Sequence, residues 1–179
     1  MRTRKLRPKN APRRTRIDPG GRSALPPWAM AEVPDIVREM AQNMATTVPQ
    51  AAALGFRFVS VSPARGSLEV PWREDLVGDP DTGVIAGGVV TSLLDHTCGL
   101  ACAAAAGTEP FSTATLDLRI DYMRPAAPRA GVVAEAHCYK ITRTVAFVRA
   151  EAWDVDRNDL IATAQAAFVV NRPRPGQAA

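Results

Sequence analysis

The longest apolar stretch of the chain runs from Gly87 to Ala106 and predicts one long helix. Its residues are apolar or small on nearly every side, so we expect the helix to be covered on nearly every side. At 1.5 Å per residue, about 20 residues make a helix close to 30 Å long. Asp95 lies near its centre, where an aspartate costs a membrane-spanning helix about 2.5 to 3.5 kcal/mol. We therefore interpret the segment as the core helix of a folded domain and expect no membrane span.

Alternation of apolar and polar residues predicts strands on both sides of this helix. Two strands precede it, over 55–62 and 66–72, with a turn between them. Further strands follow it, at residues 112–125, 132–143, 145–155 and 160–170. In the first of these, the predicted apolar face consists of Leu116, Leu118, Ile120 and Tyr122, and the opposite face of Thr115, Asp117, Arg119 and Asp121.

Two segments fall outside this pattern. Residues 35–47 have apolar side chains at helical spacing, with Pro34 before them and Pro49 after them, and predict a short amphipathic helix. Residues 74–86 are rich in Asp, Gly and Pro, and we expect an irregular loop there.

Together these elements predict an α+β fold, in which a curved antiparallel sheet of about five or six strands wraps around one long central helix. A single small sheet covers a helix on nearly all sides only by curling around it. The curled sheet then leaves edge strands and a flank exposed. We therefore expect a homo-oligomer, in which a second copy covers them.

The chain has 179 residues, of which 46% are hydrophobic and 22% charged. Such a length and composition are typical of one globular domain with a sizeable core. We place this domain at residues 34–172, between a basic disordered leader at 1–33 and a disordered tail at 173–179.

Residues 1–22 carry nine Lys or Arg and one acidic residue, whereas the whole chain has a net charge of +4. The other residues, 23–179, therefore have a net charge of −4. A basic segment can attract nucleic acid or an anionic membrane surface. This one has no aromatic residue for base stacking and no recognition helix, so we expect a solvated tail and no nucleic acid. It lacks the apolar core of a secretory signal, but its composition also fits an organellar transit peptide.

The three cysteines, Cys98, Cys102 and Cys138, form no paired framework, which favours a reducing compartment and a cytoplasmic protein. Cys98 and Cys102 are four residues apart, a spacing that matches no zinc pattern. Buried cysteines mostly pack as small apolar side chains. We therefore expect no metal and no other cofactor.

The start of the long helix and the carboxylate at its centre form the candidate site. Backbone N–H groups at a helix N-terminus lack partners and carry the positive end of the dipole, and Gly87 and Gly88 let a ligand oxygen approach them. This arrangement suits an oxyanion hole, although a glycine pair also serves as a plain turn. Asp95 is either a functional carboxylate or a buried one that is bonded to a hydroxyl or to His96. His96 lies about 100° from Asp95 around the helix. We therefore expect it to be a packed or interface histidine.

The run TGVIAGGVVTSLLDHTCGLA resembles the signature of the PaaI-like hotdog-fold acyl-CoA thioesterases. The helix of that family opens with His-Gly-Gly and carries an acid nine residues after the His; here Ala86 takes the His position and Asp95 that of the acid. Three later segments are similar to the same family, namely TLDLRIDYMRPA, TRTVAFVRAEAWD and IATAQAAFVV. The resemblance covers residues 48–171.

This resemblance implies the hotdog fold and a homodimer or homotetramer with active sites at the subunit interface. It implies that the Gly87 N–H polarises the thioester carbonyl, that Asp95 of the facing subunit is the base or nucleophile, and that Thr115 orients the water. The implied substrate-binding positions are Ala86, Gly88 and the loop residues Asp79 and Asp81. Because alanine replaces the usual histidine, and neither aspartate is the amide that the family uses, we expect lowered or altered activity.

The sequence therefore predicts an acyl-CoA thioesterase that releases a free acid and CoA. The alternative is a non-catalytic protein that binds or senses acyl-CoA, which Ala86 makes plausible. A hydratase would need an Asp and a His on one substrate, and His96 is badly placed for this. Three basic residues are either ligands of the CoA phosphates or plain solvated charges, namely Arg124, Lys140 and Arg143.

Overall fold

The computed structural model describes residues 32–108 and 111–172, and nearly all of the predicted leader and the predicted tail lie outside these residues. The helical elements are α1 (Asp35–Thr47), α2 (Pro49–Leu54), the 3-10 turn η2 (Glu74–Leu76) and α3 (Gly87–Ala106). The strands are β1 (Arg57–Ser62), β2 (Arg65–Val70), β3 (Val77–Asp79), β4 (Val84–Ile85), β5 (Ser112–Tyr122), β6 (Val132–Ile141), β7 (Val145–Trp153) and β8 (Ala162–Asn171).

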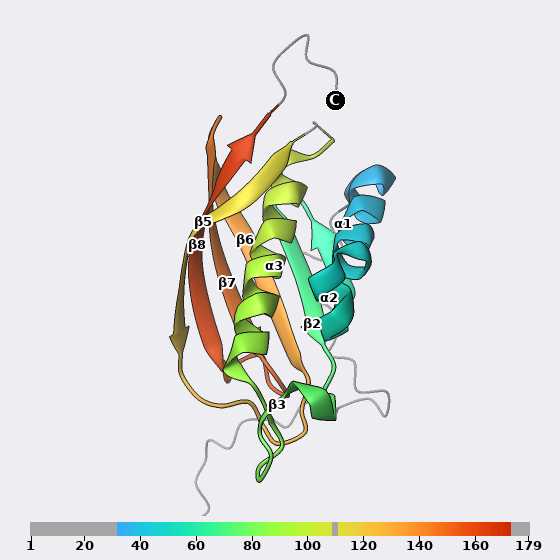
Figure 1. Ribbon diagram of the computed structural model, residues 1–179. Helices are drawn as coiled ribbons and strands as arrows, with labels where there is room; N and C mark the ends of the chain where they lie inside the picture. Colours follow the sequence, from blue (N-terminus) through green and yellow to red (C-terminus); the bar gives the residue numbers. More distant parts are fainter. Residues whose placement is uncertain (1–31, 109–110, 173–179) are drawn as a thin grey trace, which may run out of the picture.

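Six strands form one antiparallel sheet in the order β1-β2-β6-β7-β8-β5. The strands β6, β7 and β8 make a meander, and β5 pairs with β8 to become an edge of the sheet. Figure 1 shows this sheet curving around α3. The predicted fold class, a curved antiparallel sheet around one long helix, is therefore confirmed.

The helix α3 forms the core of the domain. Its side chains Leu93, Leu94 and Leu100 are almost completely covered, and it packs against β2, β6 and β7. A Cβ atom on Gly66 of β2 would lie 2.6 Å from Leu100, so the close approach of β2 to α3 requires glycine there. By its length and its mean hydropathy of 1.4, α3 would also pass for a membrane span, but most of it is buried in the domain. It is the core helix, as the sequence predicts.

The helices α1 and α2 pack beside α3. The expected helix over 35–47 is present as α1, whereas α2 is not predicted by the sequence pattern. The pattern treats Pro49 as the stop after α1, but proline is also favourable at the first position of a helix, because that position needs no N–H. Gly55, with a φ of 74°, then ends α2 in the left-handed region.

The segment 74–86, expected to be an irregular loop, instead contains η2 and a small β3–β4 hairpin. The Asp79 carboxylate builds its turn by accepting hydrogen bonds from a backbone N–H at 3.1 Å and from the Thr82 hydroxyl at 2.7 Å. Such turn residues give a short hairpin the composition of a loop. The Ala86 N–H donates to the Leu76 carbonyl at 2.9 Å and ties the hairpin to the start of α3.

The strand β5 contains a β-bulge, where its register against β8 shifts between Thr115 and Asp117. Because Leu116 is an extra residue, the alternation of side chains between the two faces of the sheet shifts by one residue at this point. Leu118 and Ile120 pack against the core as expected, but Leu116 is 60% exposed and Thr115 points toward α3. The predicted assignment of faces is therefore wrong at Leu116 and Thr115, because strict alternation does not reveal a bulge.

Candidate active site

The start of α3 presents exposed backbone donors. Within the described residues, the N–H groups of Gly87 and Gly88 have no hydrogen-bond partner, and no side chain caps this helix. A Cβ atom on Gly88 would have nothing within 4 Å. Unpaired N–H groups at the positive end of a 20-residue helix form a site for a negatively charged oxygen. The structure thus places both glycines where the sequence predicts an oxyanion hole.

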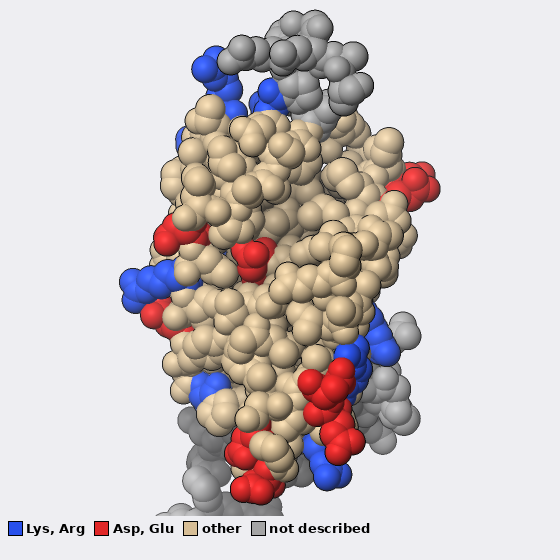
Figure 2. All heavy atoms as spheres, in the orientation of Figure 1, with Lys and Arg blue, Asp and Glu red and all other residues tan. Residues whose placement is uncertain are grey.

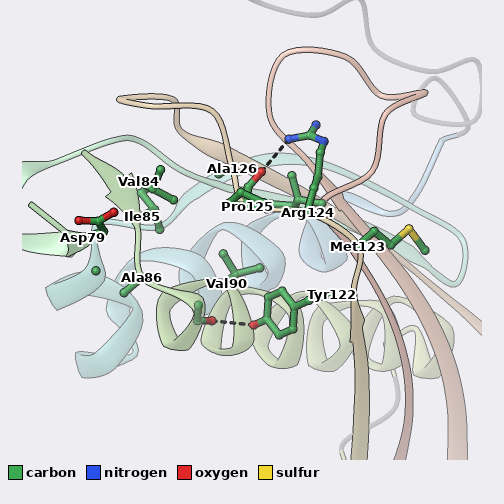
Figure 3. A pocket seen from close by; sticks show the side chains of 13 residues that line it. Asp79, Val84, Ile85, Ala86, Val90, Tyr122, Met123, Arg124, Pro125 and Ala126 are labelled. Atoms are coloured by element: carbon green, nitrogen blue, oxygen red, sulfur yellow. Dashed lines mark hydrogen bonds between the residues drawn. The ribbon is translucent and has the colours of Figure 1, made fainter. Parts of the chain in front are cut away.

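A cavity of about 570 Å³ opens beside this helix start. Figure 3 shows its walls, which come from the β3–β4 hairpin, the first turn of α3 and the segment after β5. Most of the lining is apolar, and its volume is in the usual range for small-molecule sites. The cavity is lined by several predicted site residues, namely Asp79, Ala86, Gly87 and Arg124.

Asp95, farther along α3, is in contact with Thr115 of β5. The Thr115 hydroxyl donates a hydrogen bond of 2.8 Å to Oδ1 of Asp95, whose side chain is half-buried. The bulge in β5 makes this contact possible, because it turns Thr115 toward α3. Asp95 and Gly87 are eight residues apart on one straight helix, which separates them by about 12 Å along the axis. Within one protomer, the carboxylate is therefore remote from the oxyanion donors.

The loop residues Asp79 and Asp81 differ in position. Asp79 lines the cavity, but both its carboxylate oxygens accept hydrogen bonds within the hairpin turn. Asp81 is exposed at the tip of this turn. The contacts of Asp79 fit a structural role in shaping the cavity wall.

Arg124 reaches the cavity, but its guanidinium is committed to neighbouring residues. Nη1 and Nη2 each donate to a carboxylate oxygen of Asp154 at 2.8 Å. The remaining donors reach the carbonyls of Pro125 and Asp159, and Nε lies 3.0 Å from the Asp159 carboxylate. Four of the five N–H donors of this arginine thus have hydrogen-bond acceptors, while Nε makes an ion-pair contact with Asp159 without a hydrogen bond. In this arrangement the guanidinium is bound by neighbouring protein groups.

The ion pair of Arg124 with Asp154 holds the turn after β5 to the turn after β7. The Asp154 side chain is 3% exposed and also accepts hydrogen bonds from the N–H groups of Ala127 and Val155. Hydrogen bonds from Arg124 hold the pKa of Asp154 well below its usual range. This carboxylate is therefore charged in the folded protein and stabilises it.

We predict that Asp154→Asn lowers the free energy of unfolding by about 3 kcal/mol at neutral pH, because it breaks a largely buried ion pair. The folded pKa of Asp154 is depressed, so its contribution is complete above the unfolded pKa of about 3.9 and is lost as the pH falls below it. Urea unfolding at pH 7 and pH 3 measures both effects. The difference between wild type and variant should shrink at pH 3, and Asp156→Asn, in the same turn, serves as the control. Equal stabilities of Asp154→Asn and wild type at pH 7 would contradict this role.

Lys140 and Arg143 lie away from the helix start. Lys140 is exposed and pairs with Phe147, whereas the next residue, Ile141, packs against the core. Lys140 therefore points to the outer face of the sheet. Arg143 is exposed in the turn between β6 and β7. Within one protomer, the structure does not bring either residue to Gly87.

His96 points away from the candidate site. Its Nε2 is 2.7 Å from the carbonyl oxygen of Met44, and its ring packs 5.9 Å from that of Phe56. Because a carbonyl only accepts, this nitrogen carries the proton, and it satisfies one of the last carbonyls of α1. The structure thus agrees with the interpretation of His96 as a packed histidine.

The three cysteines are buried in the core between α3 and β6. Burial raises the pKa of Cys98, and a hydrogen bond with Cys138 raises that of Cys102. Both are therefore thiols that pack as small side chains.

Two hydroxyl groups at the helix start were not identified from the sequence. The hydroxyl of Tyr122 donates to the Gly87 carbonyl at 2.7 Å and lies 2.9 Å from the hydroxyl of Thr91. Thr91 Oγ1 is also 3.1 Å from the same carbonyl. The pattern places Tyr122 on the apolar face of β5, but no local signal shows which part of α3 its hydroxyl reaches.

A curved sheet around one long helix, with polar groups along that helix, defines a hotdog-fold protein. Residues 82–161 match the family model of the thioesterase superfamily, and the chain belongs to this superfamily. A Pseudomonas aeruginosa protein of known crystal structure is 33% identical, with a TM-score of 0.68 over 74% of this chain and 98% of its own. The fold and family implied by the resemblance are therefore confirmed.

Two further relatives carry descriptive names. A mutant of the phenylacetic acid degradation protein PaaI of Thermus thermophilus is 26% identical, with a TM-score of 0.58 over 68% of this chain and 97% of its own. A Halobacterium salinarum protein, provisionally named an esterase, is 35% identical over 98 residues, which are 51% of this chain and 63% of that protein. The family and this name support a hydrolase in general.

Proposed function

We propose that this protein is an acyl-CoA thioesterase, which hydrolyses a CoA thioester to a free acid and CoA. The observation that carries the proposal is the start of α3, where the N–H groups of Gly87 and Gly88 open beside an apolar cavity. When water adds to a thioester carbonyl, its oxygen becomes negative, and such N–H groups stabilise that charge. Membership of the thioesterase superfamily supports the same reaction.

Asp95 is the proposed base or nucleophile. Thr115, which the resemblance implies as the residue that orients the water, is proposed to act from its hydrogen bond to the Asp95 carboxylate. The Thr115 hydroxyl engages Oδ1, while Oδ2 has no hydrogen-bond partner in the described part of the chain. Oδ2 can therefore take a proton from water. Water adds to the carbonyl carbon, the C–S bond breaks, and the CoA thiolate leaves and receives the proton. No step of this reaction needs a cofactor.

We infer that each active site combines two subunits. Catalytic groups act within about 3 Å of the reacting atoms, whereas Asp95 and Gly87 of one protomer are about 12 Å apart along α3. Asp95 therefore acts with Gly87 of a second copy, in a homodimer or homotetramer. Light scattering tests this inference, because a dimer has twice the protomer mass of 19.2 kDa.

The surface around α3 supports this assembly. The edge strand β5 is 11 residues long, and Leu116 and Met123 are each 60% exposed on and beside it. Figure 2 shows that the face of the molecule with α3 is mostly uncharged: one acidic group lies near its middle, and the other charged side chains gather toward its edges and lower end. An unpaired edge strand beside an uncharged face is suited to pairing with a second copy.

Two further features complete the proposal. The three unpaired cysteines fit a cytoplasmic protein, because that compartment keeps thiols reduced. Lys140 and Arg143 are the proposed partners of the CoA phosphates, whereas Arg124 is occupied by Asp154.

The second candidate function is acyl-CoA binding or sensing without hydrolysis. It is favoured by Ala86, which offers no side-chain hydrogen bond at the cavity, and by the carboxylate of Asp79, which is engaged in its own turn. The oxyanion donors are backbone groups that an alanine leaves in place, so we favour hydrolysis.

Thiol release from a panel of short, long and aromatic acyl-CoA thioesters separates the two functions. A thioesterase should release CoA from at least one of them at a rate proportional to enzyme concentration. Calorimetric binding of a panel member without any CoA release would reject hydrolysis and leave the sensing function. The preferred substrate in this panel also reports the acyl length that the cavity accepts.

A further inference from the structure

The peptide bond between Gly87 and Gly88 is held by side-chain hydroxyl groups. Tyr122 donates to its carbonyl oxygen at 2.7 Å, and the Thr91 hydroxyl is 2.9 Å from that of Tyr122. With Tyr122 as donor to the carbonyl, Thr91 donates to Tyr122 or to the same carbonyl at 3.1 Å. Figure 3 shows the tyrosine ring at the cavity wall with its hydroxyl directed at the helix start.

This contact orients the exposed N–H group of Gly88, which has no hydrogen-bond partner within the described residues and follows Gly87 in the cavity wall. The Gly87 carbonyl and the Gly88 N–H belong to one planar trans peptide, so they point in opposite directions. A bond that holds the carbonyl therefore also directs the N–H outward. Because a hydrogen bond to a carbonyl polarises its amide, it also makes that N–H a better donor.

The helix start needs such support more than most helix starts do. A peptide between two glycines has the least steric restriction on its orientation, and no side chain caps α3 among the described residues. The intrahelical bond to the Gly87 carbonyl is at the helix end, where helices fray. Tyr122 and Thr91 add two hydroxyl groups at this point.

We propose that Tyr122 is a positioning residue, which together with Thr91 orients the Gly87–Gly88 peptide so that the Gly88 N–H is a second oxyanion donor. This inference rests on the proposed thioesterase function. Tyr122 acts through the peptide, and its ring also forms part of the cavity wall. The hydroxyl should therefore affect the chemical step and the ring should affect substrate binding.

Tyr122→Phe tests the hydroxyl alone. We expect kcat for the best panel substrate to fall about tenfold, the effect of one net hydrogen bond, with KM within about twofold of wild type. Tyr139→Phe is the matched control, because Tyr139 and Tyr122 are similarly exposed, at 47% and 48%, and Tyr139 packs on Arg149 away from α3. This control should keep wild-type kcat. A Tyr122→Phe variant with unchanged kcat, or with only a raised KM, would overturn the proposal.

Thr91→Val provides a second, nearly isosteric variant. If both hydroxyls act on one peptide, the double variant should lose little more kcat than Tyr122→Phe alone, since coupled residues are not additive. Independent, fully multiplying losses would contradict the shared role. Melting temperatures of all variants identify any loss that comes from unfolding.

The amide NMR signal of Gly88 gives a readout that does not depend on activity. It should shift or broaden in Tyr122→Phe and stay unchanged in Tyr139→Phe. If wild type releases no CoA but this signal responds, the proposed function fails while the positioning contact stands. If wild type is active and neither kcat nor the signal changes in Tyr122→Phe, only the present inference fails.

Discussion

Asp95→Asn should lower kcat for thioester hydrolysis by about 10² to 10⁴, because it removes the proposed base or nucleophile. The fold should be unaffected, since the amide oxygen of asparagine can still accept the Thr115 hydrogen bond of 2.8 Å. KM should change little, because the carboxylate acts mainly in the transition state. Steady-state thiol release with the best panel substrate measures both constants.

Asp117→Asn is the matched control for this prediction. Asp117 is an exposed aspartate on β5, beyond the bulge and on the outer side of the sheet. Its variant changes the net charge equally and should keep wild-type kcat. If Asp95→Asn and Asp117→Asn turn over substrate equally well, Asp95 has no part in the reaction.

Gly87→Pro should lower kcat by about 10² to 10³, the usual effect of losing one oxyanion donor. Proline removes the Gly87 N–H, which has no partner within the described residues. The backbone accepts it, because Ala86 has φ of −61° and ψ of 137°, as required before proline, and proline is favoured at the first helical position. A Cβ atom there would lie 3.8 Å from the Tyr122 hydroxyl, an ordinary contact.

Gly87→Ala separates the loss of the N–H from the added side chain. The proline variant should be at least about tenfold slower than the alanine variant, given the size of an oxyanion donor's effect. Thermal unfolding should show that the proline variant is as stable as wild type or more stable, because proline restricts the unfolded chain. Equal kcat values for the two variants would show that this N–H does not bind the oxyanion.

Mixing Asp95→Asn with Gly87→Pro tests whether the site is shared between subunits. In a heterodimer of the two variants, one site has both substitutions and the other has neither. After subunit exchange, half of the dimers are mixed, so activity should recover to about a quarter of the wild-type value. If the mixture stays as inactive as its components, the two groups do not act across an interface.

Most of the fold could be predicted from the sequence, because its signals are local. Continuous apolar character over Gly87–Ala106 predicts a buried helix, and two-residue alternation predicts strands. The position of Gly87 at the helix start and of Asp95 near its middle follows from spacing along one helix. The β3–β4 hairpin and α2 were missed, because their short turns and a helix-starting proline have the composition of loops.

The side-chain partners in the site depend on contacts between distant segments. Arg124 binds Asp154, which is 30 residues away. From the sequence, Arg124 was predicted only as a phosphate ligand or a solvated charge. Tyr122 reaches Gly87, 35 residues away. No pattern within either segment specifies such a partner.

The sequence alone determined the fold class and the order of the groups along the helix, because these depend on local periodicity and spacing, and its motifs carried the resemblance to the family. Only the tertiary structure decided which groups meet. The bulge at Leu116 turns Thr115 toward Asp95, although alternation placed it on the other face. The helix separates Asp95 from Gly87 by about 12 Å, and this distance is the reason for the proposal that two copies share each active site. Periodicity reports which face is buried, whereas pairing depends on strand register and on the three-dimensional path of the chain.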